Sequence, residues 1–192
     1  MQNEVETNEY SLVIYPGKDV MDMVLAERAL FNETYNFRPR HFIKPQIVVT
    51  NFFASEGMEI TLVRWLQRIC SLEHGFTITL NNYSGYPTHT IFLRVFDATP
   101  VQQFVTQLNV MKDFIKTGPA GLFRRPHLPI VSKLSTGIYE QALSDYSHKL
   151  FHESFAVEEL VLLKRKDPFD TFKTVQVFGL LPMGNDLFNK VA

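Results

Sequence analysis

Two short segments of the chain share one pattern, and this internal echo constrains the fold more than any other feature of the sequence. The first segment is Lys44–Val49 and the second, about 80 residues later, is Arg125–Val131. Each begins with a basic residue and a proline, continues with a hydrogen-bonding side chain, and ends in an apolar run rich in β-branched residues. Such runs are typical of strands. The echo therefore predicts two related strands in two related halves of the chain.

The echo assigns four residues to one shared wall, because alternate side chains of a strand point to the same face of a sheet. Gln46 and Val48 share a face in the first strand, and His127 and Pro129 share a face in the second. Side by side, the two strands bring all four residues together. Pro129 offers no N–H to a strand ladder, so its position is expected at a sheet edge, a bulge or a strand end.

This arrangement resembles that of the 2H phosphoesterase superfamily, the family of 2′-5′ RNA ligases and cyclic nucleotide phosphodiesterases. The family signature is a pair of His-x-Thr/Ser motifs, each on a strand of a two-lobed sheet, facing each other across a cleft. The resemblance implies that one histidine takes a proton, that the other gives one, and that the two hydroxyls hold phosphate oxygens. It covers about residues 8–182, chiefly through the order of the elements.

The chain departs from this signature at three of its four positions. Gln46 stands in place of the first histidine, Val48 in place of the first hydroxyl residue, and Pro129 in place of the second. His127 is the motif residue that is kept, and histidine can act as an acid or a base near neutral pH. Glutamine can hydrogen-bond a ligand but exchanges no proton. The resemblance therefore implies His127 as the catalytic candidate, in a cleft that has lost part of its chemistry.

Basic residues flank both echo segments and are candidate ligand contacts. Cations there could attract a phosphate or an acidic ligand, and Lys44 and Arg125, each two residues before the motif position, are the foremost of them. The alternative is an ordinary solvated surface. The first cluster contains Arg38, Arg40, His41 and Lys44, and the second contains Arg124, Arg125 and Lys133.

A polar and aromatic stretch between two alternating segments is a further candidate. Aromatic side chains in such a loop either stack on a base or cap the core, and the sequence leaves both alternatives open. The stretch and its border contain Asn81, Asn82, Tyr83, Tyr86 and His89.

The sequence predicts neither a metal site nor a cofactor. His148 and His152 are four residues apart but lack the glutamate of the zinc protease motif. The chain also has no phosphate loop, no dinucleotide glycine fingerprint and no Gly-x-Ser-x-Gly.

Length and composition fit a single bilobal domain over residues 1–192, with its core at about residues 8–182. The formal net charge of −1 gives no bulk attraction to nucleic acid. The single Cys70 excludes an internal disulfide. Met1–Asn8 has no signal-peptide core, and no apolar run approaches the roughly 18 residues of a membrane helix. We therefore expect a cytoplasmic protein with no membrane partner.

The order of predicted elements favours an α+β fold of two lobes, with largely antiparallel sheets and a central cleft. Strands and helices alternate, but two hairpins imply antiparallel pairing. Strands are predicted at Tyr10–Tyr15, Gln46–Phe53, Phe76–Leu80, His89–Phe96, the second echo segment, Phe155–Leu163 and Lys173–Leu180. Helices are predicted after Gly17, at Gly57–Leu72, from a Thr99 cap through Ile115, and at Gly137–Leu150.

Three functions are compatible with these features. The favoured one is a degenerate 2H phosphoesterase-like protein that binds a nucleotide, an RNA end or another phosphorylated ligand without full catalysis. The second is an active RNA 2′,3′-cyclic phosphodiesterase or 2′-5′ RNA ligase-like enzyme that uses His127. The third is a protein-interaction scaffold with a plugged cleft.

Overall fold

Two antiparallel sheets of four strands each make up the computed structural model, which describes residues 7–87, 89–117, 121–122 and 125–183. The first sheet contains β1 (Thr7–Ile14), β2 (Ile47–Ser55), β7 (Glu159–Arg165) and β8 (Lys173–Gly179), in the order β2-β1-β7-β8. The second contains β3 (Phe76–Tyr86), β4 (Thr90–Val95), β5 (His127–Ser132) and β6 (His152–Val157), in the order β5-β4-β3-β6.

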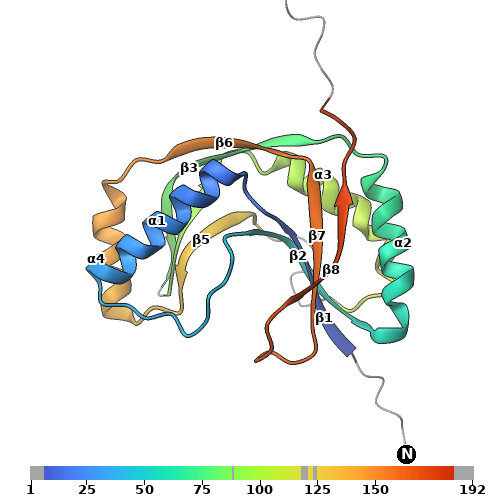
Figure 1. The fold of residues 1–192 in the computed structure, drawn as a ribbon, viewed down its shortest axis with the longest axis horizontal. Coiled ribbons are helices and arrows are strands. Elements are labelled where there is room, and N and C mark those ends of the chain that lie inside the picture. Colours follow the sequence, from blue (N-terminus) through green and yellow to red (C-terminus); the bar gives the residue numbers. More distant parts are fainter. Residues whose placement is uncertain (1–6, 88, 118–120, 123–124, 184–192) are drawn as a thin grey trace, which may run out of the picture.

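Helices cover one face of each sheet, and the ribbon bends into an arch (Figure 1). Helices α1 (Lys18–Thr34) and α4 (Thr136–Ser147) pack on the second sheet at one end of the arch. Helices α2 (Glu59–Cys70) and α3 (Thr99–Gln107) pack on the first sheet at the other end. Two short 3₁₀ turns, η1 (Glu56–Met58) and η2 (Leu108–Met111), adjoin α2 and α3.

The two echo strands occupy matching places, because β2 is an edge strand of the first sheet and β5 is an edge strand of the second. Both strands contain a one-residue bulge against their neighbour, at Val49 in β2 and at Ile130 in β5. Val49 is the third residue after Gln46, and Ile130 is the third residue after His127. The echo in sequence is thus a repeat in structure. Pro129 lies on an edge strand, one of the positions predicted for it, and the bulge is at its neighbour Ile130.

The largest hydrophobic core joins the two halves. It contains side chains of the first sheet such as Tyr10 and Phe52, side chains of the second such as Leu93 and Leu128, and the buried face of α2. A separate cluster centred on Phe31 lies between α1, α4 and the second sheet. Within the described residues, no helix is long and apolar enough to cross a membrane.

The α+β class and most predicted elements are confirmed, and three predictions are wrong. The loop predicted at Asn81–Thr88 is strand as far as Tyr86, because Gly85 and Tyr83 pack against α4. The strand predicted at Phe155–Leu163 is two strands, β6 and β7, that belong to different sheets.

The third wrong prediction concerns the helix that was expected to run from a Thr99 cap through Ile115. Asp97 Oδ1, instead of a Thr99 side chain, accepts a hydrogen bond from the helix start, from the Thr99 N–H at 2.9 Å. The α-helix ends at Gln107, because the chain then tightens into η2. Leu108 and Ile115 are nevertheless buried, as the predicted apolar face requires. The break predicted around Gly118 lies largely outside the described residues.

Candidate functional site

The faces of the two sheets that carry no helix are called here the inner faces. On β2 the buried Ile47 and Val49 point toward the helices, whereas Val48 is half-buried on the inner face. On β5 the buried Leu128 points toward the helices, whereas His127 and Pro129 are half-buried. The period-two alternation thus holds in both strands as far as the bulge.

The inner face of the first sheet is apolar around Val48. Val48 pairs with Val13 of β1 and packs in a small cluster with Val161, Leu163, Tyr15 and Phe172. A methyl-bearing side chain in this position offers no hydrogen bond. An anion placed against Val48 would therefore lose water without gaining a partner from this residue.

A cation lies at the end of this apolar patch, just before Gln46. The Lys44 ammonium is 3.7 Å from the centroid of the Tyr15 ring, a cation–π contact. Burial raises the pKa of the Tyr15 hydroxyl, so Tyr15 stays neutral near pH 7. Lys44 is therefore a positive charge at a defined place beside Gln46.

His127 lies among aromatic rings on the inner face of the second sheet. Its ring centroid is 4.8 Å from that of Phe92 and 5.1 Å from that of Tyr86. The His127 Nδ1 is 2.9 Å from the backbone carbonyl of Arg125. Because a carbonyl only accepts, Nδ1 carries the hydrogen, and in the neutral ring Nε2 is then the basic nitrogen.

Arg28 of α1 connects the two echo segments through their backbones. Its Nη1 donates to the Ile43 carbonyl at 2.5 Å, and its Nη2 donates to the Pro129 carbonyl at 2.7 Å. Burial lowers the pKa of the Arg28 guanidinium. Sequence reasoning missed Arg28, because its partners lie 15 and 101 residues away and the surrounding helix gives no signal of them.

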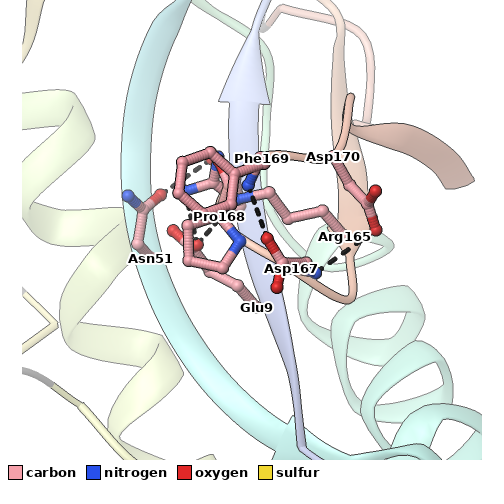
Figure 2. A network of polar contacts seen from close by, with 8 residues as sticks. Glu9, Asn51, Arg165, Asp167, Pro168, Phe169 and Asp170 are labelled. Atoms are coloured by element: carbon pink, nitrogen blue, oxygen red, sulfur yellow. Dashed lines mark hydrogen bonds and ion pairs between the residues drawn. The ribbon is translucent and has the colours of Figure 1, made fainter.

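At the end of the first sheet's inner face that is remote from Lys44, polar side chains pair with one another and with the backbone (Figure 2). Arg165 Nη2 pairs with Glu9 Oε2 at 2.6 Å, and Arg165 Nη1 donates to the Pro168 carbonyl at 2.9 Å. The Ser11 hydroxyl donates to Asn51 Oδ1 at 2.8 Å. Because the Arg165 charge is already neutralised by Glu9, this network holds the β7–β8 turn and is a poor candidate for a phosphate site.

Solved structures with the same architecture are known, whereas no family model and no curated protein matches the sequence. E. coli LigT complexed with 3′-AMP aligns with a TM-score of 0.65 at 16% identity, over 91% of this chain and 98% of LigT. LigT complexed with ATP aligns with a TM-score of 0.60 at 15% identity, over 92% and 99%. A structure described as a phosphoesterase gives 0.63 at 15% identity, over 92% and 99%. The chain has the 2H phosphoesterase fold. At these identities the likeness concerns the fold alone.

The structure shows where the predicted site residues lie in this 2H phosphoesterase-like fold. Val48 lies on β2 at the edge of one sheet, Gln46 immediately precedes that strand, and His127 and Pro129 lie on β5 at the edge of the other sheet, in contact with β2. Lys44 and Arg125 each stand two residues before their echo strand's motif position, and both are exposed. Their roles, and that of His127, stay predictions.

The tyrosines predicted as candidate ligand contacts lie in two different environments. Tyr83 packs against Tyr146 at 4.8 Å and caps the helical side of the second sheet, so it is not placed to stack on a ligand. Tyr86 lies beside His127 instead. Phe92 was missed, because an aromatic residue in an apolar strand is indistinguishable from a core residue in sequence. Arg124 lies outside the described residues. Within the described residues, no group of three or more His, Cys, Asp or Glu side chains could hold a metal ion.

Proposed function

We propose that this protein is a degenerate 2H phosphoesterase-like protein that binds a nucleotide or another phosphorylated ligand between Gln46 and His127. In this proposal the ligand is held without full catalysis. The likeness to LigT, which has been solved with 3′-AMP and with ATP, supports a ligand of this class.

One observation carries the proposal: Gln46, immediately before β2, and His127, the first residue of β5, each stand three residues before the bulge of an edge strand. Both side chains are half-buried, and Arg28 links the backbones of their two segments. A glutamine amide and an imidazole at such positions offer donors and an acceptor to one ligand from two sides.

The residues at the motif positions support binding over turnover. Gln46 cannot take or give a proton near pH 7, and the loss of one acid–base partner typically costs about 10²–10⁴ in rate. Val48 lies in an apolar cluster, and Pro129 has neither a hydroxyl nor an N–H. The reaction would thus lack one proton-transfer group and two phosphate contacts.

The surroundings of the two residues suit a nucleotide. Tyr86, which is half-buried, packs on the buried Phe92 and lies beside His127, and an aromatic ring in such a place can stack on a base. Lys44 beside Gln46 and the exposed Arg125 before His127 supply positive charge for a phosphate.

A second function, a scaffold that binds another protein, is favoured by one observation. The packing of Val48 with Tyr15 and Phe172 fills part of the inner face with carbon. The scaffold needs no ligand in this region, so the two proposals differ in a measurable way.

Isothermal titration calorimetry with 2′,3′-cyclic nucleotides, mononucleotides and cyclic dinucleotides at two salt concentrations tests the proposal. We expect binding that weakens as salt rises and that is lost in His127→Ala and Gln46→Ala. His148→Ala, an exposed histidine at the end of α4, is the matched control and should bind normally.

Two outcomes would contradict the proposal. The absence of heat with every phosphorylated ligand would leave the scaffold as the better explanation. Robust hydrolysis of a cyclic phosphodiester that His127→Ala abolishes would show instead that the protein is an active enzyme.

A further inference from the structure

The outward face of α2 differs in composition from the other exposed helix faces. From Ile60 to Cys70 this helix contains two arginines and a tryptophan but no acid and no lysine. The carboxylate of Glu59, the first residue of the helix, already has two partners: it accepts a hydrogen bond from the Tyr10 hydroxyl at 2.9 Å and forms an ion pair with Lys164 at 2.6 Å. On α1, in contrast, the exposed Lys18 and Asp22 neutralise each other at 3.2 Å.

A shallow hollow lies on this face, lined by Thr61, Arg64, Trp65 and Arg68. These residues are three, four and seven positions apart, so they share one side of the helix. Trp65 is half-buried and packs on the core, and the Arg68 guanidinium carbon is 5.9 Å from the centroid of its ring. In the described part of the chain, no carboxylate lies within ion-pair distance of Arg64 or Arg68.

We propose that the outward face of α2 binds an acidic amphipathic segment of a partner protein. The carboxylates of the segment would pair with Arg64 and Arg68, and its apolar side chains would cover Trp65. Two further exposed apolar residues, Ile60 at 67% and Leu72 at 70% exposure, flank the hollow and would be covered as well.

The composition of the face favours a protein partner. Tryptophan and arginine are the residues most enriched at interface positions that dominate binding energy, whereas lysine and the acids are depleted in interface centres. The face matches this pattern through Trp65 and the two arginines.

Other occupants fit less well. The hollow measures about 200 Å³, smaller than the ~300–1,000 Å³ of small-molecule pockets, and one helix alone lines it. Affinity for a nucleic acid strand grows with the number of phosphates neutralised, and this face offers two cations in a chain of net charge −1. A peptide, in contrast, can also contact the helix surface around the hollow, so the small volume of the hollow does not limit the area that is buried.

Fluorescence of Trp65 provides a direct test, because the chain has one tryptophan. The full chain is titrated with a synthetic helical peptide that presents glutamates four residues apart beside leucines. We expect a saturable change in emission that weakens as salt rises.

A charge swap distinguishes specific pairing from general attraction. Arg64→Glu with Arg68→Glu should weaken binding of the glutamate peptide by about tenfold or more, and should create binding of the same peptide with lysines in place of its glutamates. Both arginines are exposed, so the variant should keep its fold, as circular dichroism can verify. Arg38→Glu with Arg40→Glu, a second exposed pair, is the control and should bind the glutamate peptide normally.

Three results would overturn the proposal: an unchanged Trp65 emission, an equal loss in the Arg38 and Arg40 control, or binding of a deoxythymidine 10-mer that is tighter than that of the peptide and that Arg64→Glu with Arg68→Glu abolishes. Because the third result requires loss of binding in the Arg64 and Arg68 variant, it does not depend on the nucleotide site proposed near His127.

Discussion

Arg28 donates to the backbone carbonyl of Pro129, which lies 101 residues further along the chain and two residues after His127. The same guanidinium holds the Ile43 carbonyl, three residues before Gln46. One side chain therefore couples the two segments that carry the candidate site.

Replacing Arg28 should destabilise the fold. Arg28→Ala removes two charged hydrogen bonds from a largely buried group, and we expect a loss of about 2–4 kcal/mol in the free energy of unfolding. Urea denaturation followed by circular dichroism measures it. Arg38→Ala, at an exposed position, is the control. A stability loss below 0.5 kcal/mol, roughly that of a surface substitution, would show that the bridge contributes little.

Restoring the family motif should restore chemistry. The native chain is expected to hydrolyse 2′,3′-cyclic nucleotides at or below the detection limit. The triple variant Gln46→His, Val48→Thr and Pro129→Thr replaces the missing proton-transfer group and both hydroxyls, and should raise the rate by about 10²-fold or more. Chromatography of the nucleotide products measures it.

The control for that experiment is the triple variant with His127→Ala added, which should return to the native level. If the restored motif gives no activity although the variant is folded, the two strands do not hold their motif positions in the geometry that the reaction needs.

A methyl group on Gly85 should disturb the packing of β3 on α4. A Cβ at Gly85 would lie 2.5 Å from the Tyr139 hydroxyl and 3.1 Å from a Leu143 methyl. Tyr139 is buried and cannot swing into solvent, so Gly85→Ala should cost about 1–3 kcal/mol. Thermal or urea unfolding tests this. Adding Tyr139→Phe removes the hydroxyl and should recover part of the loss, and the absence of any recovery would place the strain elsewhere.

Stability should fall in alkaline solution. Burial raises the pKa of the Cys70 thiol to about 12 from its usual 9.0. Burial also raises the pKa of Tyr146 well above its usual 10.0, and the hydrogen bond to Glu27 adds to this shift. These groups ionise more readily in the unfolded chain, so their contribution is complete below about pH 9 and is lost as the pH rises, by about 1.4 kcal/mol per pH unit for each group.

Urea unfolding at several pH values between 7 and 11 checks this dependence. Tyr146→Phe should give a shallower slope above pH 10 than the native chain. A free energy of unfolding that stays constant to pH 11 would contradict the assigned burial of these groups.

The sequence predicted the echo strands and most elements well, because both depend on local pattern. Alternation correctly placed Val48 opposite Ile47 and Val49, and the missing N–H of Pro129 correctly indicated a sheet edge. The residues that surround the candidate site were harder to predict. Tyr86 was expected in a loop, and its place beside His127 depends on the pairing of β3 with β4.

The two wrong strand predictions have a common physical cause, which is that sheet membership is not local. The apolar run from Phe155 to Leu163 has no turn signal, yet at Glu158 the chain passes from the second sheet to the first. Asn81 and Asn82 suggested a loop, but Asn81 pairs with His152 of β6 and the Asn82 N–H donates to the Phe151 carbonyl, so β3 continues through a bulge against β4.

The paired bulges at Val49 and Ile130 bear on how such a site can change over time. Each bulge interrupts the alternation of its strand, so that Val49 and Thr50 are both buried, as are Ile130 and Val131. The residues before each bulge, which include Gln46 and His127, therefore follow an inward–outward alternation that does not continue into the rest of the strand. Substitutions before the bulge can therefore change the chemistry that such a strand presents, while the pairing of the strand behind the bulge stays the same.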